Sequence, residues 1–425
     1  MNSGIKKAGV GVGCLFLLAG FLRPSPEFSL GGYFKNFLVA FDPPEIFFSG
    51  GALYPDRLMG LVSSRLRLQA FLDISRRLRF SAAYDLSPRV QDPFLFQKGI
   101  FFTGVDPYGY RIADLNDRIF PREKKSAESF VVFQNLDRAV LSLTTGPADI
   151  YIGRQAIAWG SARVINPTDV IAPFALQEFD KEERVGVDAV RVRIPLGFMG
   201  EIDAGYVFGR DFHFSRSAFF LRTKFYAAAT DISLLLLGFR ENMLIGLDVA
   251  RSIGGAGFWL EGAYVAADAF PRDESAAVHD YIRMSTGLDY SFSGKTYGFI
   301  EYHFNSGGAR NPGNYLANLS RPSMGEGSVF LMGRHYLIPG LNYQITPLIT
   351  LTAEVLFNLE DGSFFAAPLV EYNLAANVYV AVGGFVGLGK SPVSPSGSDP
   401  SAGPVLRSEF GSYAEALYSS VRIYF

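Results

Sequence analysis

The chain ends on a segment that alternates between apolar and polar side chains and stops on an aromatic residue. Val421, Ile423 and Phe425 would share one face of a strand, with a serine, an arginine and a tyrosine on the other, because successive side chains of a strand point to opposite faces. Such a strand fits a wall with lipid on one side and water on the other. A single short segment is weak evidence, so the pattern must recur along the chain.

The alternation does recur, in segments of roughly ten or more residues. Residues 65–74 and 78–87 interleave apolar with charged or small side chains, which is typical of strands with one apolar face. We predict an all-β, antiparallel fold of about 18 strands. They cover residues 33–41, 58–74, 78–89, 130–145, 149–159, 185–194, 201–209, 218–227, 230–239, 243–251, 257–267, 281–293, 296–304, 333–346, 348–357, 364–374, 378–386 and 409–425.

The lengths of the predicted connections separate a barrel from a soluble sandwich. Short connections such as 75–77 and 294–295 alternate with connections that include long ones such as 90–129 and 160–184. Beyond the N-terminus, no apolar run reaches the length of about 18 residues that a helical span needs. We therefore predict a transmembrane β-barrel with short periplasmic turns and long extracellular loops. A barrel of this size encloses an aqueous channel unless a loop fills it, and the two long connections are the candidates.

Residues 1–28 are predicted to be a secretory signal peptide and residues 29–425 a single barrel domain. Lys6 and Lys7 precede an apolar stretch that ends at Arg23 and two prolines, as in a signal peptide. No clean cleavage site is visible, and an uncleaved anchor is the alternative. The single cysteine, Cys14, lies in this stretch, so the mature chain would have no disulfide. A net charge of −2 gives no reason to expect nucleic acid as a partner.

One motif carries a family resemblance. It consists of Gly153, Arg154, Gln155, Trp159, Gly160, Arg163, Asn166, Pro167 and Asp169. The motif resembles a segment of porin-like bacterial outer-membrane barrels, including largely uncharacterised families and, more loosely, alginate-export-type barrels. The resemblance implies a strand that enters a loop packed into the lumen, with a bend at Gly160. The longer basic signature of alginate exporters is not present.

Two positions need separate comment. By alternation Arg154 falls on the lipid side, so we expect a bulge near Gly153 or a position close to the rim. The end of the chain resembles the closing strand of outer-membrane barrels, which implies that Phe425 is read by the barrel assembly machinery.

Alternation also assigns two sets of charged residues to the water side. The basic set is Arg65, Arg67, Arg79, Arg138, Arg191, Arg193, Arg222 and Lys224, and the acidic set is Asp248, Glu261, Asp289, Glu301, Glu354 and Glu371. They are candidate pore-lining residues, because charged rings are one way in which pores select solutes. The alternative is that they pair with cross-strand neighbours and only stabilise the barrel, and the sequence leaves both open.

No catalytic or metal-binding set is visible. The four histidines are dispersed, and none has the spacing of a zinc site. His303 beside Glu301 on one predicted inward face is the best acid–base candidate, but a lone histidine in a lumen is more often simply solvated. We expect no enzyme, no metal and no cofactor.

These observations favour a porin-like channel in the bacterial outer membrane, through which small hydrophilic solutes diffuse passively past a charged lumen. One alternative is a channel dedicated to exporting or importing one solute class, such as an anionic saccharide or a hydrophobic compound. Another is a surface scaffold without transport. The expected partners are membrane lipid and small solutes, and the sequence leaves open whether the barrel forms a homo-oligomer.

Overall fold

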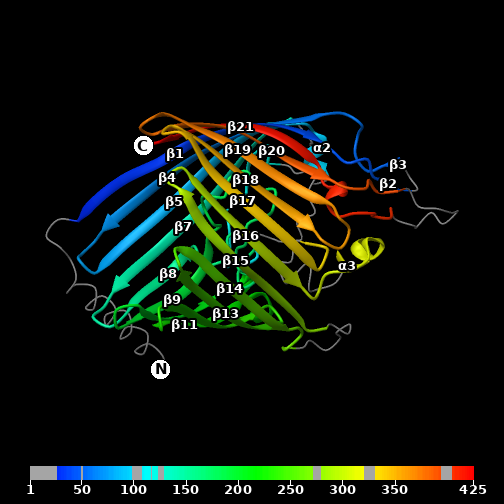
Figure 1. The fold of residues 1–425 in the computed structure, drawn as a ribbon. Coiled ribbons are helices and arrows are strands. Elements are labelled where there is room, and N and C mark those ends of the chain that lie inside the picture. Colours follow the sequence, from blue (N-terminus) through cyan, green and yellow to red (C-terminus); the bar gives the residue numbers. More distant parts are fainter. Residues whose placement is uncertain are drawn as a thin grey trace, which may run out of the picture.

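The computed structural model describes residues 26–48, 51–97, 108–115, 117–122, 129–270, 279–319, 331–393 and 404–425. Within this part of the chain, eighteen strands form one closed antiparallel barrel (Figure 1). They are β1 (Glu27–Asp42), β4 (Met59–Asp73), β5 (Leu78–Gln91), β7 (Phe130–Thr144), β8 (Asp149–Gln155), β9 (Val187–Leu196), β10 (Gly200–Val207), β11 (Ala218–Ala227), β12 (Thr230–Phe239), β13 (Asn242–Ile253), β14 (Ala256–Ala266), β15 (Tyr281–Ser293), β16 (Thr296–Asn305), β17 (His335–Thr346), β18 (Ile349–Asn358), β19 (Phe364–Ala375), β20 (Val378–Leu388) and β21 (Glu415–Tyr424). The predicted fold class is confirmed.

Smaller elements do not belong to the ring of eighteen strands. They are the hairpin of β2 (Phe47–Phe48) and β3 (Gly51–Ala52), β6 (Arg118–Phe120), α2 (Phe94–Gln97), α3 (Tyr315–Leu319), and the 3₁₀ turns η1 (Arg210–Phe212), η2 (Phe214–Arg216), η3 (Pro312–Asn314) and η4 (Phe410–Ser412). β6 pairs with β7. No helix within the described ranges is long and apolar enough to cross a membrane. The predicted signal peptide falls almost wholly outside these ranges and stays a prediction.

The barrel closes where its first and last strands, β1 and β21, pair. β1 pairs with β4 on one side and with β21 on the other. At this seam the amide of Gly32 donates to the carbonyl of Phe425 (2.8 Å), and the amide of Phe425 donates back (3.0 Å). Closure leaves no strand edge unpaired, which is the condition for a sheet to span lipid.

The two faces of the wall follow the alternation of the sequence. In β21, Val421 and Ile423 are exposed on the outside, whereas Ser420, Arg422 and Tyr424 line a cavity inside. The same outward exposure of large apolar side chains recurs around the ring, for example at Leu234, Ile245, Ile282, Ile300 and Leu341. One main cluster of buried apolar side chains includes residues of the connection between β8 and β9, and partly buried residues of the same connection pack against the other.

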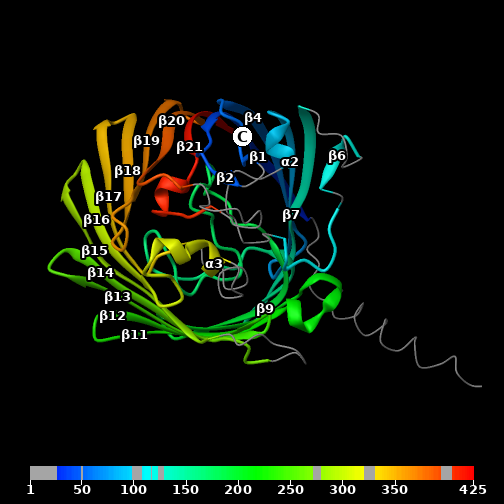
Figure 2. The same cartoon turned by 90° about the vertical axis from the view of Figure 1, so that its right-hand side faces the viewer.

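Connection length differs between the two ends of the barrel. At one end the strands are joined by short turns, such as 228–229 between β11 and β12 and 254–255 between β13 and β14. All the long connections lie at the opposite end, among them 92–129, 156–186 and 389–414. Figure 2 looks into the barrel and shows that part of the polypeptide in the long connections folds back inside the ring of strands.

Most predicted strand limits agree with the structure to within about two residues, the usual uncertainty of element boundaries, but three do not. β1 begins at Glu27 rather than at residue 33, because Gly31 and Gly32 continue the ladder with β4. β8 ends at Gln155 rather than at residue 159, because the chain turns into the lumen there. β21 begins at Glu415 rather than at Glu409. Glu409 lies outside the strand, and its side chain is part of a buried polar cluster.

Glu409 lies at the long-connection end and joins three connections that are distant in sequence. Its carboxylate, fully buried, accepts hydrogen bonds from the amide of Met332 (2.9 Å), the amide group of Asn358 (2.8 Å) and the hydroxyl of Tyr336 (2.5 Å). Its own amide donates to Asp361 (2.7 Å). Burial raises the pKa of Glu409 to about 7, although the hydrogen bonds from Tyr336 and Met332 lower it.

Replacing Gly32 by alanine is expected to destabilise the seam. A Cβ atom at Gly32 would lie 2.1 Å from the carbonyl oxygen of Arg67, whereas one at Gly60 in the same pair of strands would meet nothing within 4 Å. We expect Gly32→Ala to cost about 1–3 kcal/mol and to lower the temperature at which the unboiled barrel loses its fast migration on a gel. Gly60→Ala is the control, and equal transition temperatures for the two variants would contradict the close approach.

Glu409 should make the stability of the barrel depend on pH. With a pKa of 4.5 in the unfolded chain and about 7 in the folded protein, the folded state keeps a proton between these values that the unfolded state has released. Its contribution is therefore complete below pH 4.5 and is lost as pH rises through 7, a change of about 3 kcal/mol. Glu409→Gln cannot titrate, so the difference in urea midpoint between wild type and this variant should change between pH 4 and pH 8. Glu415→Gln, at an exposed position, is the control for loss of a glutamate.

Candidate functional site

The connection between β8 and β9, residues 156–186, lies inside the barrel and is called the inner loop here. It turns inward at Gly160, which has φ = +116°. A Cβ atom at this position would lie 2.6 Å from the carboxylate of Glu261, so only glycine fits both the backbone angle and the space. A second turn follows, in which the amide of Asp169 donates to the carbonyl of Asn166 (3.2 Å).

Two glutamates of the wall accept hydrogen bonds from the backbone of the inner loop. Glu261 on β14 accepts from the amides of Ser161 and Ala162 (both 3.1 Å) and from the amide and hydroxyl of Thr168 (2.9 and 2.7 Å). Glu301 on β16 accepts from the amides of residues 163, 164 and 165 at 2.7 to 3.3 Å. Both carboxylates are fully buried. They supply acceptors that an irregular segment cannot find in its own backbone.

Other side chains of the same wall also bind the inner loop. Asp248 accepts from the hydroxyl of Ser161, and Asp289 forms an ion pair with Arg163 (2.5 Å). Arg283 donates to the carbonyl of Pro167 (2.8 Å). Four of the six predicted acidic residues therefore contact the inner loop directly.

The far part of the inner loop reaches across the bore to β1 and β21. The ammonium group of Lys35 on β1 lies 2.8 Å from Asp180 and 2.6 Å from Glu182. The ring of Phe179 packs against those of Phe385 (5.2 Å between centroids) and Tyr418 (5.0 Å). The inner loop thus spans the lumen from one wall to the other.

The predicted basic residues are all ion-paired. Arg67 is buried between Asp85 (3.2 Å) and Asp137 (2.8 Å). Arg65 pairs with Asp180 of the inner loop, and Arg138 with Asp137. The remaining pairs join neighbouring strands or turns: Arg79 with Asp73, Arg191 with Asp203, Arg193 and Arg222 with Glu201, and Lys224 with Asp231.

The motif residues lie at the end of β8 and in the first half of the inner loop. Arg154 is buried rather than exposed to lipid, because it pairs with Asp188 (2.7 Å) and Asp114 (2.9 Å) one residue before the end of β8. Gly153 before it has φ = +117°, but the pairing of β8 with β7 and β9 continues through Gly153 without the expected bulge. The indole of Trp159 donates to Asp203 (3.2 Å). Asp169 pairs with Arg184, yet burial raises the pKa of Asp169 to about 6.

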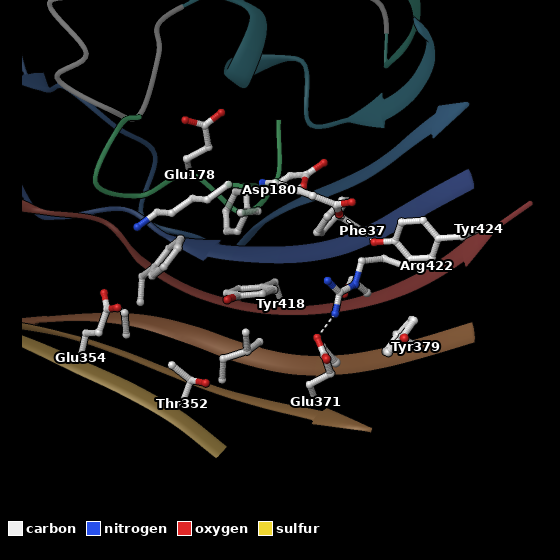
Figure 3. A pocket seen from close by; sticks show the side chains of 18 of the residues that line it. Phe37, Glu178, Asp180, Thr352, Glu354, Glu371, Tyr379, Tyr418, Arg422 and Tyr424 are labelled. Carbon is white, nitrogen blue, oxygen red and sulfur yellow. Dashed lines mark hydrogen bonds and ion pairs between the residues drawn. The ribbon is translucent and has the colours of Figure 1, made fainter. Parts of the chain in front are cut away.

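Among the residues that the structure describes, three cavities that border the inner loop bear on a passage through the barrel. The turn-side cavity, about 660 Å³, lies between residues 178–182 and the wall from β18 to β21, and it reaches Asn377 in a short turn. In Figure 3, Glu354 and Glu371 project from this wall toward the side on which Glu178 and Asp180 lie. The loop-side cavity, about 310 Å³, lies between the inner loop and residues such as Arg283 and Leu331 nearer the long connections. The β1-side cavity, about 410 Å³, lies between the inner loop and β1, β4 and β5.

Shared lining residues show where these cavities adjoin. The loop-side and β1-side cavities share residues 173–175. The β1-side and turn-side cavities meet at Phe37 and residues 178–180, where the Phe179 ring is packed against the wall. The loop-side and turn-side cavities share two residues, Lys181 and Glu354. We call the space between these two side chains the neck.

The predicted acid–base candidates are not brought together for catalysis. Glu301 is bound to the inner loop, whereas Nδ1 of His303 lies 2.8 Å from the hydroxyl of Ser285. The hydroxyl of Ser285 also donates to the carbonyl of Ile165 (2.6 Å). Ser285 therefore helps to hold the inner loop. Among the described residues, no group of three or more histidine, aspartate or glutamate side chains is arranged to hold a metal ion.

Sequence reasoning missed three residues of this site. Lys35 and Phe179 contact partners far away in the sequence, and Lys181 belongs to a segment without periodicity. Only Lys35 had a usable signal, since alternation places it on the inward face of the first strand between Tyr33 and Phe37.

No family model and no curated protein matches the sequence. The fold does match solved structures. OccK8 (OprE) of Pseudomonas aeruginosa aligns with a TM-score of 0.56 at 9% identity, covering 95% of this chain and 99% of that one. OccAB2 of Acinetobacter baumannii aligns at 0.55 and 9%, covering 94% and 98%. OccK2 (OpdF) of P. aeruginosa, solved in complex with glucuronate, aligns at 0.54 and 11%, covering 95% and 99%. The chain thus has the fold of these porins.

Removing the two anchoring carboxylates should release the inner loop. In the double variant Glu261→Ala, Glu301→Ala, several buried amides lose their acceptors, at a cost of about 1–3 kcal/mol each. We expect trypsin to cleave the folded variant after Arg163, Lys181 or Arg184, while the wild type stays intact at these positions. Glu415→Ala is the control for loss of a glutamate. If the double variant and the wild type resist trypsin equally, contacts other than those with Glu261 and Glu301 are sufficient to hold the inner loop in place.

Proposed function

We propose that the protein is a porin-like channel of the bacterial outer membrane, through which small hydrophilic solutes diffuse passively. The observation that carries this proposal is the succession of the loop-side and turn-side cavities through the barrel, joined at the neck. Both are lined by several charged and polar side chains. Such a lining suits solutes that keep much of their hydration.

The outward face of the wall supports the membrane location. Large apolar side chains are exposed around the ring, and a surface of this kind is stable only in contact with lipid or detergent. By the usual orientation of such barrels, the short turns would lie in the periplasm and the long connections outside the cell. The match to outer-membrane porin folds agrees with this placement.

The pairing of the lumen charges bears on which solutes pass. The basic residues of the predicted pore lining are neutralised by nearby carboxylates, so we propose that they mainly stabilise the wall. Glu354 and Glu371 both line the turn-side cavity, but Glu371 is paired with Arg422, so Glu354 is the one that differs. We propose no catalytic role for any of these residues.

A channel dedicated to one solute class is the second candidate. The inner loop divides the bore into small cavities, which favours selection over general leakage. OccK2, with a similar fold, was solved with glucuronate, a small hydrophilic acid. The cavities beside the inner loop do not favour a scaffold without transport, since such a barrel needs no internal cavities.

Ion conduction through planar bilayers tests the proposal. We expect discrete steps of small conductance for the wild type. Phe179→Ala should remove the ring that separates the β1-side from the turn-side cavity, adding a second route and raising conductance roughly twofold. Phe198→Ala, in a short turn where the side chain is 96% exposed, is the control. A folded, heat-modifiable barrel that carries no current would contradict a channel function.

A further inference from the structure

Lys181 and Glu354 occupy the one place where the loop-side and turn-side cavities meet. Lys181 projects from the tip of the inner loop, and Glu354 from the middle of β18 in the opposing wall. No other residue lines both cavities among those described. If solutes pass the inner loop by this route, as the proposed function requires, they pass between these two side chains.

Neither charge is held in an ion pair. The charge of Lys181 does act on the nearby Glu178, whose pKa is raised by burial and lowered by Arg65 and Lys181. Asp180 and Glu182 are paired with Lys35, Glu371 with Arg422, Arg184 with Asp169 and Arg163 with Asp289. Within the described part of the chain, neither the Lys181 ammonium nor the Glu354 carboxylate has an ion-pair or hydrogen-bond partner, and they do not pair with each other. Lys181 is exposed to the lumen.

A free cation and a free anion on opposite sides of a passage define a specific type of partner. A simple anion is attracted by Lys181 and repelled by Glu354, and a simple cation experiences the reverse, so neither gains much net energy. A molecule that carries both charges can contact both groups at once. The flexible four-carbon stem of lysine lets the ammonium follow solutes of different length.

We infer that the neck is a filter for small zwitterions, with the solute's amine held by Glu354 and its carboxylate by Lys181. This inference rests on the proposed channel function and names its solute class. The hydroxyl of Thr352 lines the turn-side cavity two residues before Glu354 on the same face of β18, so a polar group is available to a solute leaving the neck.

Three probes with the same carbon chain test the inference: 4-aminobutyrate as the zwitterion, butyrate as the anion and butylammonium as the cation. Each is added to a single wild-type channel in potassium chloride, and the duration of current blocks is measured. We expect 4-aminobutyrate to give the longest blocks. Lys181→Met and Glu354→Gln should each shorten them about fivefold, the effect of one exposed ion pair.

A charge exchange supplies the sharpest control. The double variant Lys181→Glu, Glu354→Lys keeps both charges and should restore the blocks by 4-aminobutyrate, because the solute can bind in the reverse orientation. Lys295→Met, in a short turn outside the cavities, should behave as wild type. Trypsin resistance of the inner loop confirms that the variants are folded.

The outcomes separate this inference from the proposed function. A conducting channel that is blocked equally by all three probes, or best by butyrate, overturns the zwitterion filter and leaves the channel standing. Unchanged blocks in Lys181→Met and Glu354→Gln overturn it as well. A folded barrel without any current overturns the channel function itself.

Discussion

The inner loop depends on buried carboxylates that accept hydrogen bonds from its backbone. A segment without regular structure inside a barrel has amide groups that no strand can pair, and leaving them unpaired would be costly. Glu261 and Glu301 supply acceptors to the incoming half of the loop, and Asp137 accepts from the amide of Gly186 (2.9 Å) where the loop ends. The acidic side of the lumen is therefore first an anchor, and the shape of the passage follows from where that anchor places the chain.

This anchoring changes what the charges of the lumen mean. Rows of unpaired opposite charges on facing walls would impose a strong electric field across the lumen. Most of these charged side chains, however, form ion pairs or hydrogen bonds. Arg67, for example, lies buried between Asp85 and Asp137, and removing either partner would leave charge unbalanced in a poorly solvated place. Of the two explanations that the sequence left open, stabilisation of the wall accounts for most of the charged positions. Lys181 and Glu354 remain available to solutes because neither is needed to hold the loop.

The sequence was sufficient to predict the strands of the barrel wall and the start of the inner loop. Alternation gives the strands because each inward or outward position is decided locally by lipid on one side and water on the other. The bend at Gly160 could be expected from a short motif. The contact of Lys35 with Asp180 could not, since it joins residues far apart in the sequence across the bore and depends on how far the loop reaches. Glu409 was misplaced in a strand for the same reason, because its partners come from two other connections and from the ends of β17 and β18.

The two halves of the inner loop are held by different kinds of contact, and this has a consequence for selectivity. Residues 160–168 are fixed mainly through their backbone, so their side chains are constrained by the position of the chain. Residues 177–182 are held by side chains, namely Phe179 among aromatic rings and Asp180 and Glu182 with Lys35. Lys181 lies between these fixed points and takes part in neither contact. A substitution at Lys181 can therefore alter the chemistry of the neck while the loop keeps its position, which makes this residue the most direct means of changing the solute without losing the fold.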